Sequence, residues 1–242
     1  MADIVLEVCV DSLAGLAAAV RGGADRIELC AALGVGGLTP SAGMMQAAAG
    51  VPVPVYAMIR PRSGDFVYSD AELLSMRVDI DLARDMGMAG VVFGASLVDG
   101  RLDLAAMERL VSWSDGMGKV LHRAFDLTGG SFPQALESAI DLGIERILTS
   151  GGAPNVTEGL TRLAECYELA NGRITIMPGA GVEIETVGAL MSRLPLREVH
   201  GSCSEPMEGL LRDVARLGLA GHLPRATSAV KVRALKARLA AG

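Results

Sequence analysis

Short apolar runs alternate with longer amphipathic stretches along the whole chain. The runs are rich in valine, isoleucine and leucine, which is typical of strands buried in a parallel sheet. There are eight of them, at residues 4–10, 26–30, 55–61, 90–94, 119–125, 146–151, 174–179 and 198–202. The pattern therefore predicts eight strands distributed over nearly the whole sequence.

Apolar residues near helical spacing fill the intervals between these runs. In the longest interval, Leu73, Met76 and Ile80 follow a capping Ser69 or Asp70. Several of these stretches end in glycine, which stops a helix by adopting the left-handed conformation. The expected helices cover residues 12–21, 41–49, 70–86, 103–112, 132–141, 156–170, 183–191 and 228–239.

This alternation of strands and helices indicates a parallel sheet, because parallel strands need crossover connections. Eight such units in 242 residues fit an α/β fold of the (β/α)8 TIM-barrel type, a single domain over residues 1–242. An open doubly wound sheet is the alternative, but Asp11 and Ser12 follow the first strand where that fold has a G-x-G-x-x-G motif. Residues 203–225 lack a clear pattern and are left open between a helix and a long loop.

Composition excludes several classes of function. The chain is 50% apolar and 3% aromatic, with a net charge of −6. Scattered basic residues and few stacking rings argue against nucleic-acid binding. The N-terminus lacks the pattern of a secretion signal, and no apolar run is long enough for a membrane span. We therefore expect a cytoplasmic protein whose four cysteines are reduced.

Side chains alternate along a strand, so the first two strands have an inner and an outer face. Val8 and Leu29 represent the apolar face that suits the layer beneath the helices. Charged side chains inside a barrel are costly unless they are paired or used. A structural ion-pair network, such as Glu28 with Arg60, is the alternative to a functional site. The residues expected to point inward are Glu7, Cys9, Arg26, Glu28 and Cys30.

Polar residues at the carboxyl ends of the strands form a candidate active site, because barrel enzymes assemble theirs at that end. His122 titrates near neutrality and is the candidate for proton transfer, although a hydrogen-bonded core histidine explains it equally well on its own. The candidate catalytic residues are His122, Glu28, Asp126 and Glu7, and the candidate ligand-binding residues are Arg60, Gly179, Gly181, His200 and Ser202.

Glycine-rich turns follow the last three strands, with the sequences TSGGAPN, MPGAGVE and HGSCSE. Glycine lets backbone N–H groups approach an anion, and Val182-Glu183 opens a helix with an electropositive N-terminus. Barrels often bind phosphate at the turns after the seventh and eighth strands. Tight connections explain each turn singly, but three in succession favour a small anionic ligand.

Cys9 and Cys30 occupy inward positions on adjacent strands, where two sulfurs can reach one soft metal ion. Thiolate and thioether ligands select Cu(I) or zinc, and Met58 on the third strand is a candidate third ligand. Zinc prefers four ligands, and no obvious set of four is present. The alternative role of each cysteine is that of a small buried hydrophobic residue.

Longer stretches of the chain resemble the CutC family of copper homeostasis proteins. They are EVCVDS, GGADRIELC, GGLTPS, IRPRSGDFVYSD, VFGAS, HRAFD, LTSGG, MPGAG and H-x-S, and they span residues 4–202. The resemblance implies a cytoplasmic, homo-oligomeric TIM barrel that handles copper and binds Cu(I) through Cys9 and Cys30. After H-x-S the family usually has a basic residue, whereas this chain reads Cys203-Ser204-Glu205, which weakens an anion site there.

Two functions follow from these observations. The first is a copper homeostasis protein that binds Cu(I). The second is a barrel enzyme of the lyase, aldolase or isomerase type, acting on a small phosphorylated or carboxylate substrate; this reading rests partly on fold analogy, and a fold alone does not determine function.

Overall fold

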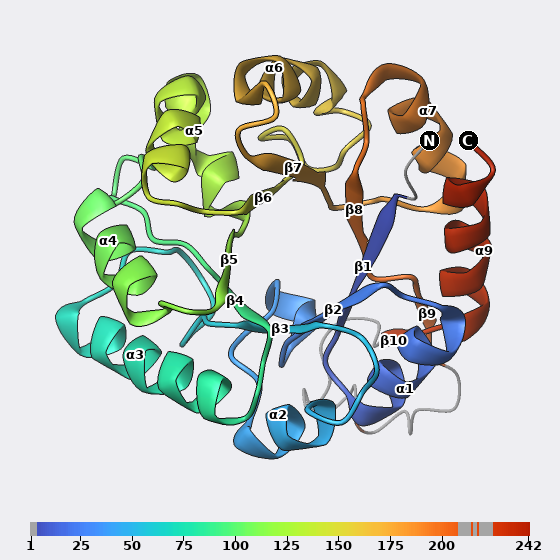
Figure 1. The fold of residues 1–242 in the computed structure, drawn as a ribbon, viewed down its shortest axis with the longest axis horizontal. Coiled ribbons are helices and arrows are strands. Elements are labelled where there is room, and N and C mark those ends of the chain that lie inside the picture. Colours follow the sequence, from blue (N-terminus) through green and yellow to red (C-terminus); the bar gives the residue numbers. More distant parts are fainter. Residues whose placement is uncertain (1–3, 208–213, 215–216, 218–224) are drawn as a thin grey trace.

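The computed structural model describes residues 4–207, 214, 217 and 225–242, and it forms a (β/α)8 barrel (Figure 1). Eight parallel strands make one sheet in the order β7-β6-β5-β4-β3-β2-β1-β8. Strands β7 and β8 lie side by side and complete the ring, although the sheet has no hydrogen-bonded ladder between them in the described part of the chain. The predicted fold is confirmed.

All eight predicted strands are present, most of them shorter than the apolar runs. The fifth differs most, because residues 123–125 are not a strand. The ring of His122 accepts a hydrogen bond from the N–H of Ala124 and caps a 3-10 helix, η2 (Arg123–Ser131). The strands are β1 (Val5–Val10), β2 (Arg26–Leu29), β3 (Val55–Met58), β4 (Gly90–Phe93), β5 (Gly118–Leu121), β6 (Arg146–Thr149), β7 (Thr175–Pro178) and β8 (Glu198–Gly201).

Helices surround the strands, and α9 packs against both α1 and α7 (Figure 1). Helix α3 begins with a capping box between Ser69 and Glu72. Helix α6 begins later than predicted, because Gly159 lies against the carbonyl of Ser150 and residues 156–159 form turns. The helices are α1 (Leu13–Gly22), η1 (Leu33–Val35), α2 (Ala42–Ala48), α3 (Asp70–Asp85), α4 (Leu104–Trp113), α5 (Phe132–Asp141), α6 (Leu160–Ala170), α7 (Ile184–Arg193) and α9 (Ala229–Ala240).

The segment 203–225, which the sequence left open, contributes at its two ends to a small antiparallel sheet. Strand β9 (Ser204–Pro206) pairs there with β10 (Arg225–Thr227). The helix considered for this segment falls largely outside the described residues. None of the helices among the described residues has the length and apolar character required to cross a membrane.

The inner and outer faces of the strands separate as predicted. Val8 and Leu29 belong to the large core between the sheet and the helices. Glu7, Arg26 and Glu28 are buried on the opposite face, inside the barrel. The apolar residues that pack together there are Cys30, Tyr56, Met58, Val92, Val120, Leu148 and Met177.

Tyr56 fills the barrel interior because Gly118 leaves room for its ring. A Cβ atom at Gly118 would lie 2.7 Å from Cε1 and 2.8 Å from Cζ of Tyr56. We expect Gly118→Ala to lower the free energy of unfolding by about 1–3 kcal/mol through overpacking, as measured by urea unfolding.

Gly43 supplies the matched control, since it is exposed on α2 and its nearest neighbour to an added Cβ is Ser41 Oγ at 3.9 Å. Gly43→Ala should raise the free energy of unfolding by about 0.5–1 kcal/mol. In a Tyr56→Leu background the loss caused by Gly118→Ala should shrink. An equal loss in both backgrounds would contradict the packing argument.

Candidate functional site

A cavity of about 380 Å³ opens at the carboxyl ends of the strands, the end predicted to carry the site. Its volume falls within the range of about 300–1,000 Å³ found for small-molecule sites. Charged and apolar side chains share its wall. The ionisable and sulfur-containing residues that line it are Cys9, Glu28, Met58, Arg60, His122, Arg123, Glu183 and His200.

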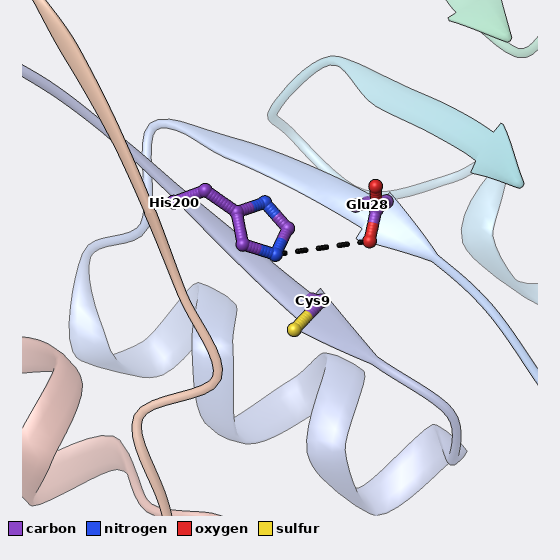
Figure 2. Close-up of side chains that lie close together, drawn as sticks. All are labelled: Cys9, Glu28 and His200. Carbon is purple, nitrogen blue, oxygen red and sulfur yellow. Dashed lines mark ion pairs between the residues drawn. The ribbon is translucent and has the colours of Figure 1, made fainter. Parts of the chain in front are cut away.

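Cys9, Glu28 and His200 form a compact cluster at this cavity (Figure 2). They come from the neighbouring strands β1, β2 and β8. Register explains their meeting, because Cys9 lies opposite Glu28 in one ladder of β1 and Glu7 lies opposite His200 in the other. A sulfur, a carboxylate oxygen and a ring nitrogen lie within 4.8 Å of one another, and all three residues are buried. Such a set can hold one metal ion.

Glu7 lies behind this cluster and orients His200. Its carboxylate accepts hydrogen bonds from Nε of Arg26 at 2.5 Å and from Nδ1 of His200 at 2.8 Å. Arg26 also pairs with Glu198. Burial favours the neutral acid, but His200 and Arg26 outweigh it and lower the pKa of Glu7 to about 2. Glu7 is thus an ionised anchor, and carboxylates in this position commonly orient metal-binding imidazoles.

His200 directs its other ring nitrogen, Nε2, toward Glu28, with 3.8 Å between Nε2 and Oε2. Burial disfavours the charged ring, but Cys9, Glu28 and Glu7 raise the pKa of His200 well above its usual value. Burial and the charge of Glu7 raise the pKa of Glu28 as well. These surroundings favour a proton on Nε2, with which a metal ion at this nitrogen would compete.

Cys30 lies beside the cluster and is not one of its three members. Its thiol donates a hydrogen bond to Oε2 of Glu28 over 3.4 Å. Burial and the charge of Glu28 raise the pKa of this thiol well above its usual value. Cys30 is fully buried and packs in the same interior cluster as Met58, but only Met58 is among the described residues that line the cavity. The two cysteines expected to bind copper thus have different surroundings.

Arg60, Phe66 and His122 build another part of the cavity wall. The centre of the Phe66 ring lies 4.6 Å from the centre of the His122 ring and 5.0 Å from the guanidinium carbon of Arg60. Both terminal nitrogens of Arg60 donate hydrogen bonds to backbone carbonyls of nearby loops. Nε of Arg60 and Nε2 of His122 are buried and have no hydrogen-bond partner among the described residues.

His122 is held as a neutral ring. Its Nδ1 accepts a hydrogen bond from the N–H of Ala124 at 3.2 Å, so the single ring proton lies on Nε2. Burial and the charge of Arg60 lower the pKa of His122 to about 3. Burial therefore favours the neutral ring, and the role in proton transfer expected for His122 stays a prediction.

Acid should destabilise the fold through His122. Between the folded pKa of about 3 and the ordinary value of 6.5, the unfolded chain binds a proton that the folded chain does not. The stability due to the neutral ring is complete above pH 6.5 and is lost as the pH falls toward 3. His122→Asn keeps a capping acceptor, so the slope of unfolding free energy against pH should fall by about 1.4 kcal/mol per unit in this window. Urea unfolding across this pH range measures the slope, and an unchanged slope would contradict the argument.

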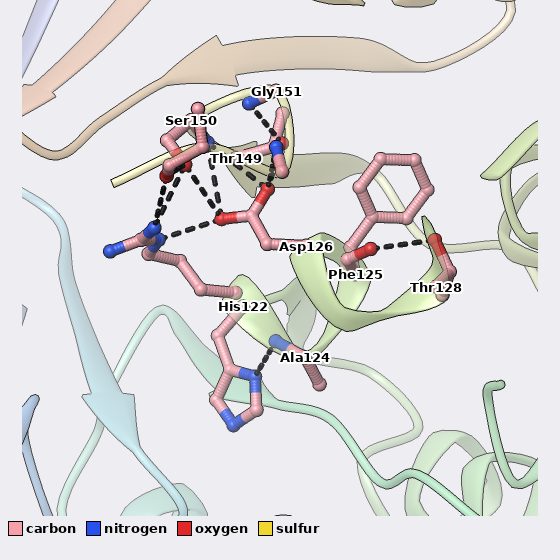
Figure 3. A network of polar contacts seen from close by, with 11 residues as sticks. His122, Ala124, Phe125, Asp126, Thr128, Thr149, Ser150 and Gly151 are labelled. Carbon is pink, nitrogen blue, oxygen red and sulfur yellow. Dashed lines mark hydrogen bonds and ion pairs between the residues drawn. The ribbon is translucent and has the colours of Figure 1, made fainter. Parts of the chain in front are cut away.

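Asp126 is bound into the turn after β6 (Figure 3). Its carboxylate accepts hydrogen bonds from the hydroxyl of Thr149 at 2.5 Å and from the N–H groups of Ser150 and Gly152 at 3.2 and 2.9 Å. It also pairs with Arg123 at 2.7 Å. Asp126 does not belong to the described lining of the cavity. These contacts fasten η2 to the turn, and the catalytic role expected for Asp126 stays a prediction.

The glycine-rich turn after β7 shapes the space around His200. A Cβ at Gly179 would clash with Cδ1 of Leu148 and would lie 3.3 Å from Cβ of His200, so glycine lets both side chains pack against this turn. Gly181 lines the cavity with a left-handed φ of 81°. Ser202 also lines it, with its hydroxyl 3.0 Å from that of Ser204. The anion-binding role expected for these residues stays a prediction.

Sequence reasoning missed several residues of the cavity wall, Phe66 and Arg123 among them. Phe66 lies in the loop between β3 and α3, outside every predicted element. The conformation of that loop decides whether its side chain reaches the cavity. In the predicted strand 119–125, alternation would place Arg123 on the face opposite to His122, but β5 ends at Leu121 and Arg123 lines the cavity. No periodicity in the sequence marks either position.

Comparisons with known proteins identify relatives over nearly the whole chain. A CutC family protein of Rhizobium meliloti (strain 1021) is 56% identical over 239 residues, which are 99% of this chain and 97% of the relative. One of Caulobacter vibrioides (strain NA1000 / CB15N) is 48% identical over 241 residues, covering 97% of this chain and 98% of the relative.

A solved structure and a family profile agree with these relatives. The structure is a CutC protein from Streptococcus agalactiae, named for a proposed role in copper homeostasis. It matches with a TM-score of 0.78 at 32% identity and covers 82% of this chain and 98% of that chain. The profile of the CutC family matches residues 4–205. The chain therefore belongs to the CutC family.

Proposed function

We propose that the protein serves copper homeostasis by binding one Cu(I) ion per chain at the cluster of Cys9, Glu28 and His200. The observation that carries the proposal is the approach of thiol, carboxylate and imidazole within 4.8 Å of one another. Glu7 supports it by orienting His200 from the other ring nitrogen. The name given to the related structure from Streptococcus agalactiae is consistent with this role.

The chemistry of the donors favours a soft ion. Cys9 offers a thiolate and His200 an imidazole, both of which suit Cu(I), while Met58 on the same wall offers a thioether. A carboxylate is a harder ligand, so Glu28 balances the charge of the ion more than it binds it. Zinc also accepts this combination of ligands and is the competing ion that an experiment must include.

The pair of Cys9 and Cys30 implied by the family resemblance is an alternative arrangement of the same site. To become a ligand, Cys30 has to give up its hydrogen bond to Glu28 and lose its proton in a buried position. Its raised pKa opposes that loss. We therefore assign the ligand roles to Cys9 and His200 and a supporting role to Cys30.

A reducing compartment suits such a site, because a free thiol must be available to the ion. All four cysteines of the chain are unpaired, which supports a cytoplasmic location. The family resemblance supports a homo-oligomer, and light scattering on the purified protein measures its mass directly.

Anaerobic titration with Cu(I), in competition with a coloured Cu(I) chelator, tests the proposal. We expect saturation at one Cu(I) per chain and weaker binding of Zn(II) in a parallel titration. X-ray absorption at the copper edge should show both sulfur and nitrogen ligands. Absence of saturable uptake, or tighter binding of zinc than of copper, would contradict the proposal.

A further inference from the structure

A chain of charged side chains lies behind the cluster of Cys9, Glu28 and His200. Glu7 on β1 is opposite Arg26 of β2 in one ladder and opposite His200 of β8 in the other, so the three residues are neighbours across the sheet. Glu7 exposes none of its surface and Arg26 only 6%. Neither belongs to the described lining of the cavity, whereas His200 does. Glu7 and Arg26 can therefore influence the cavity only through the side chains that line it.

The carboxylate of Glu7 has one hydrogen-bond donor on each oxygen. Oε2 accepts from Nε of Arg26 at 2.5 Å, and Oε1 accepts from Nδ1 of His200 at 2.8 Å. Donors on both oxygens fix the plane of the carboxylate, which in turn fixes the ring of His200 through its Nδ1–H group. The other ring nitrogen, Nε2, then faces Glu28 beside Cys9 (Figure 2). Without Arg26, nothing in the described part of the chain would hold Oε2 in this orientation.

Arg26 is itself held in place by groups other than Glu7. Its terminal nitrogen Nη2 pairs with Glu198 and lies 3.2 Å from the sulfur of Met177. Because Nε and Nη2 belong to one rigid guanidinium plane, that plane joins the carboxylates of Glu7 and Glu198. The centre of the Tyr56 ring lies 5.5 Å from the guanidinium carbon, within the range of a cation–π contact. These contacts set the guanidinium in one orientation.

We infer that Arg26 is a positioning residue for this cluster: its guanidinium fixes Glu7, and Glu7 fixes the ring of His200 with Nε2 toward the metal. Arg26 acts from two hydrogen bonds away and is not itself a ligand. The inference rests on the proposed function for its consequence in copper binding. The orientation of the His200 ring, however, belongs to the metal-free protein as well and can be measured without copper.

Arg146 supplies a matched control, because it shares the surroundings of Arg26. Its side chain is 12% exposed against 7% for Arg26, and its Nε lies 3.2 Å from Oε2 of Glu198. Its guanidinium carbon lies 4.9 Å from the centre of the Tyr56 ring. Among the described residues, however, Glu7 is hydrogen-bonded by Arg26 and not by Arg146. Arg146→Gln therefore removes a buried arginine from the same network and leaves the contact between Arg26 and Glu7 in place.

The rate at which the Nδ1 proton of His200 exchanges with water in the metal-free protein tests the inference. Histidine-selective 15N NMR measures this rate, and the signal is assigned by its loss in His200→Gln. Arg26→Gln should speed the exchange at least about tenfold, because Glu7 then no longer holds the ring in one orientation. Arg146→Gln should leave the rate as in the unaltered protein. In the copper titration, Arg26→Gln should weaken Cu(I) binding by about 10–100-fold and Arg146→Gln should not.

A third measurement needs no variant and therefore decides the matter even if Arg26→Gln fails to fold. In the copper-loaded unaltered protein, Nδ1 of His200 should keep its proton while Nε2 binds the ion, and copper on Nδ1 would overturn the inference. An unchanged exchange rate in Arg26→Gln would overturn it too, as would equal acceleration in Arg146→Gln, which indicates a general loosening of the barrel.

The two proposals can fail separately. An unchanged exchange rate in Arg26→Gln, with normal copper uptake by the unaltered protein, removes this inference alone. Failure of copper uptake by the unaltered protein, with exchange accelerated only in Arg26→Gln, removes the metal proposal and supports the positioning of His200 by Arg26.

Discussion

Replacing Cys9 by Ser should abolish Cu(I) binding, whereas replacing Cys30 by Ser should change the affinity less than about tenfold. Loss of groups that merely orient a metal ligand typically costs about 10–100-fold in affinity, so removal of the only thiolate in the cluster should cost more. Serine at position 30 can still donate a hydrogen bond to Glu28, as the Cys30 thiol does. Anaerobic competition titrations on the two variants give the affinities.

The pair of variants is matched, because both cysteines are buried in the barrel and differ mainly in their membership of the cluster. Cys166→Ser is a further control, since Cys166 is buried on α6, away from the cavity lining. Loss of copper binding in both the Cys9 and Cys30 variants would establish the two-cysteine arrangement. Retention in both would exclude the cluster as the copper site.

Replacing Glu7 by Gln should lower the free energy of unfolding by about 3–5 kcal/mol at neutral pH, as expected when one partner of a buried ion pair is removed. Glu7 is fully buried between Arg26 and His200 and bonds to both. Without the charge of Glu7, Arg26 and His200 lose the carboxylate to which both are hydrogen-bonded. Urea unfolding of the two proteins measures the difference.

Glu137→Gln provides the control for this experiment, because Glu137 pairs with Arg173 at 2.6 Å on the exposed surface. Such pairs contribute less than about 1 kcal/mol. A loss for Glu7→Gln that is no larger than the loss for Glu137→Gln would show that the buried network does not stabilise the fold.

Acid supplies an independent signature of Glu7. Its pKa falls from the ordinary value of 4.5 to about 2 in the folded chain, so its contribution to stability is complete above pH 4.5. That contribution is lost as the pH decreases toward 2, where the folded carboxylate becomes protonated. The Glu7→Gln variant should lack this part of the acid transition, and identical acid transitions would contradict the assigned pKa.

The barrel and the direction of its inner side chains could be predicted from the sequence because both depend on local periodicity. Period-two alternation places Glu7, Cys9 and Glu28 on one face of their strands, and parallel strands bring them to one end of the barrel. The structure confirms that face and adds the register, which sets Cys9 opposite Glu28 and His200 opposite Glu7.

The roles of individual side chains could not be predicted, because they depend on partners distant in sequence. Asp126 is a candidate catalytic acid by type, yet its oxygens are engaged by the turn after β6. His122 is a candidate base by type, yet burial and Arg60 lower its pKa to about 3. Arg60 in turn is held by carbonyls of two loops whose conformations no local pattern specifies.

The cluster joins strands from opposite ends of the polypeptide, since β8 is a neighbour of β1 in the sheet. A nascent chain in which residue 200 has not yet been synthesised has the thiol of Cys9 but lacks the imidazole of His200 beside it. Under the proposed function, copper capture therefore requires β8, and a chain that terminates before β8 cannot hold the ion at this cluster.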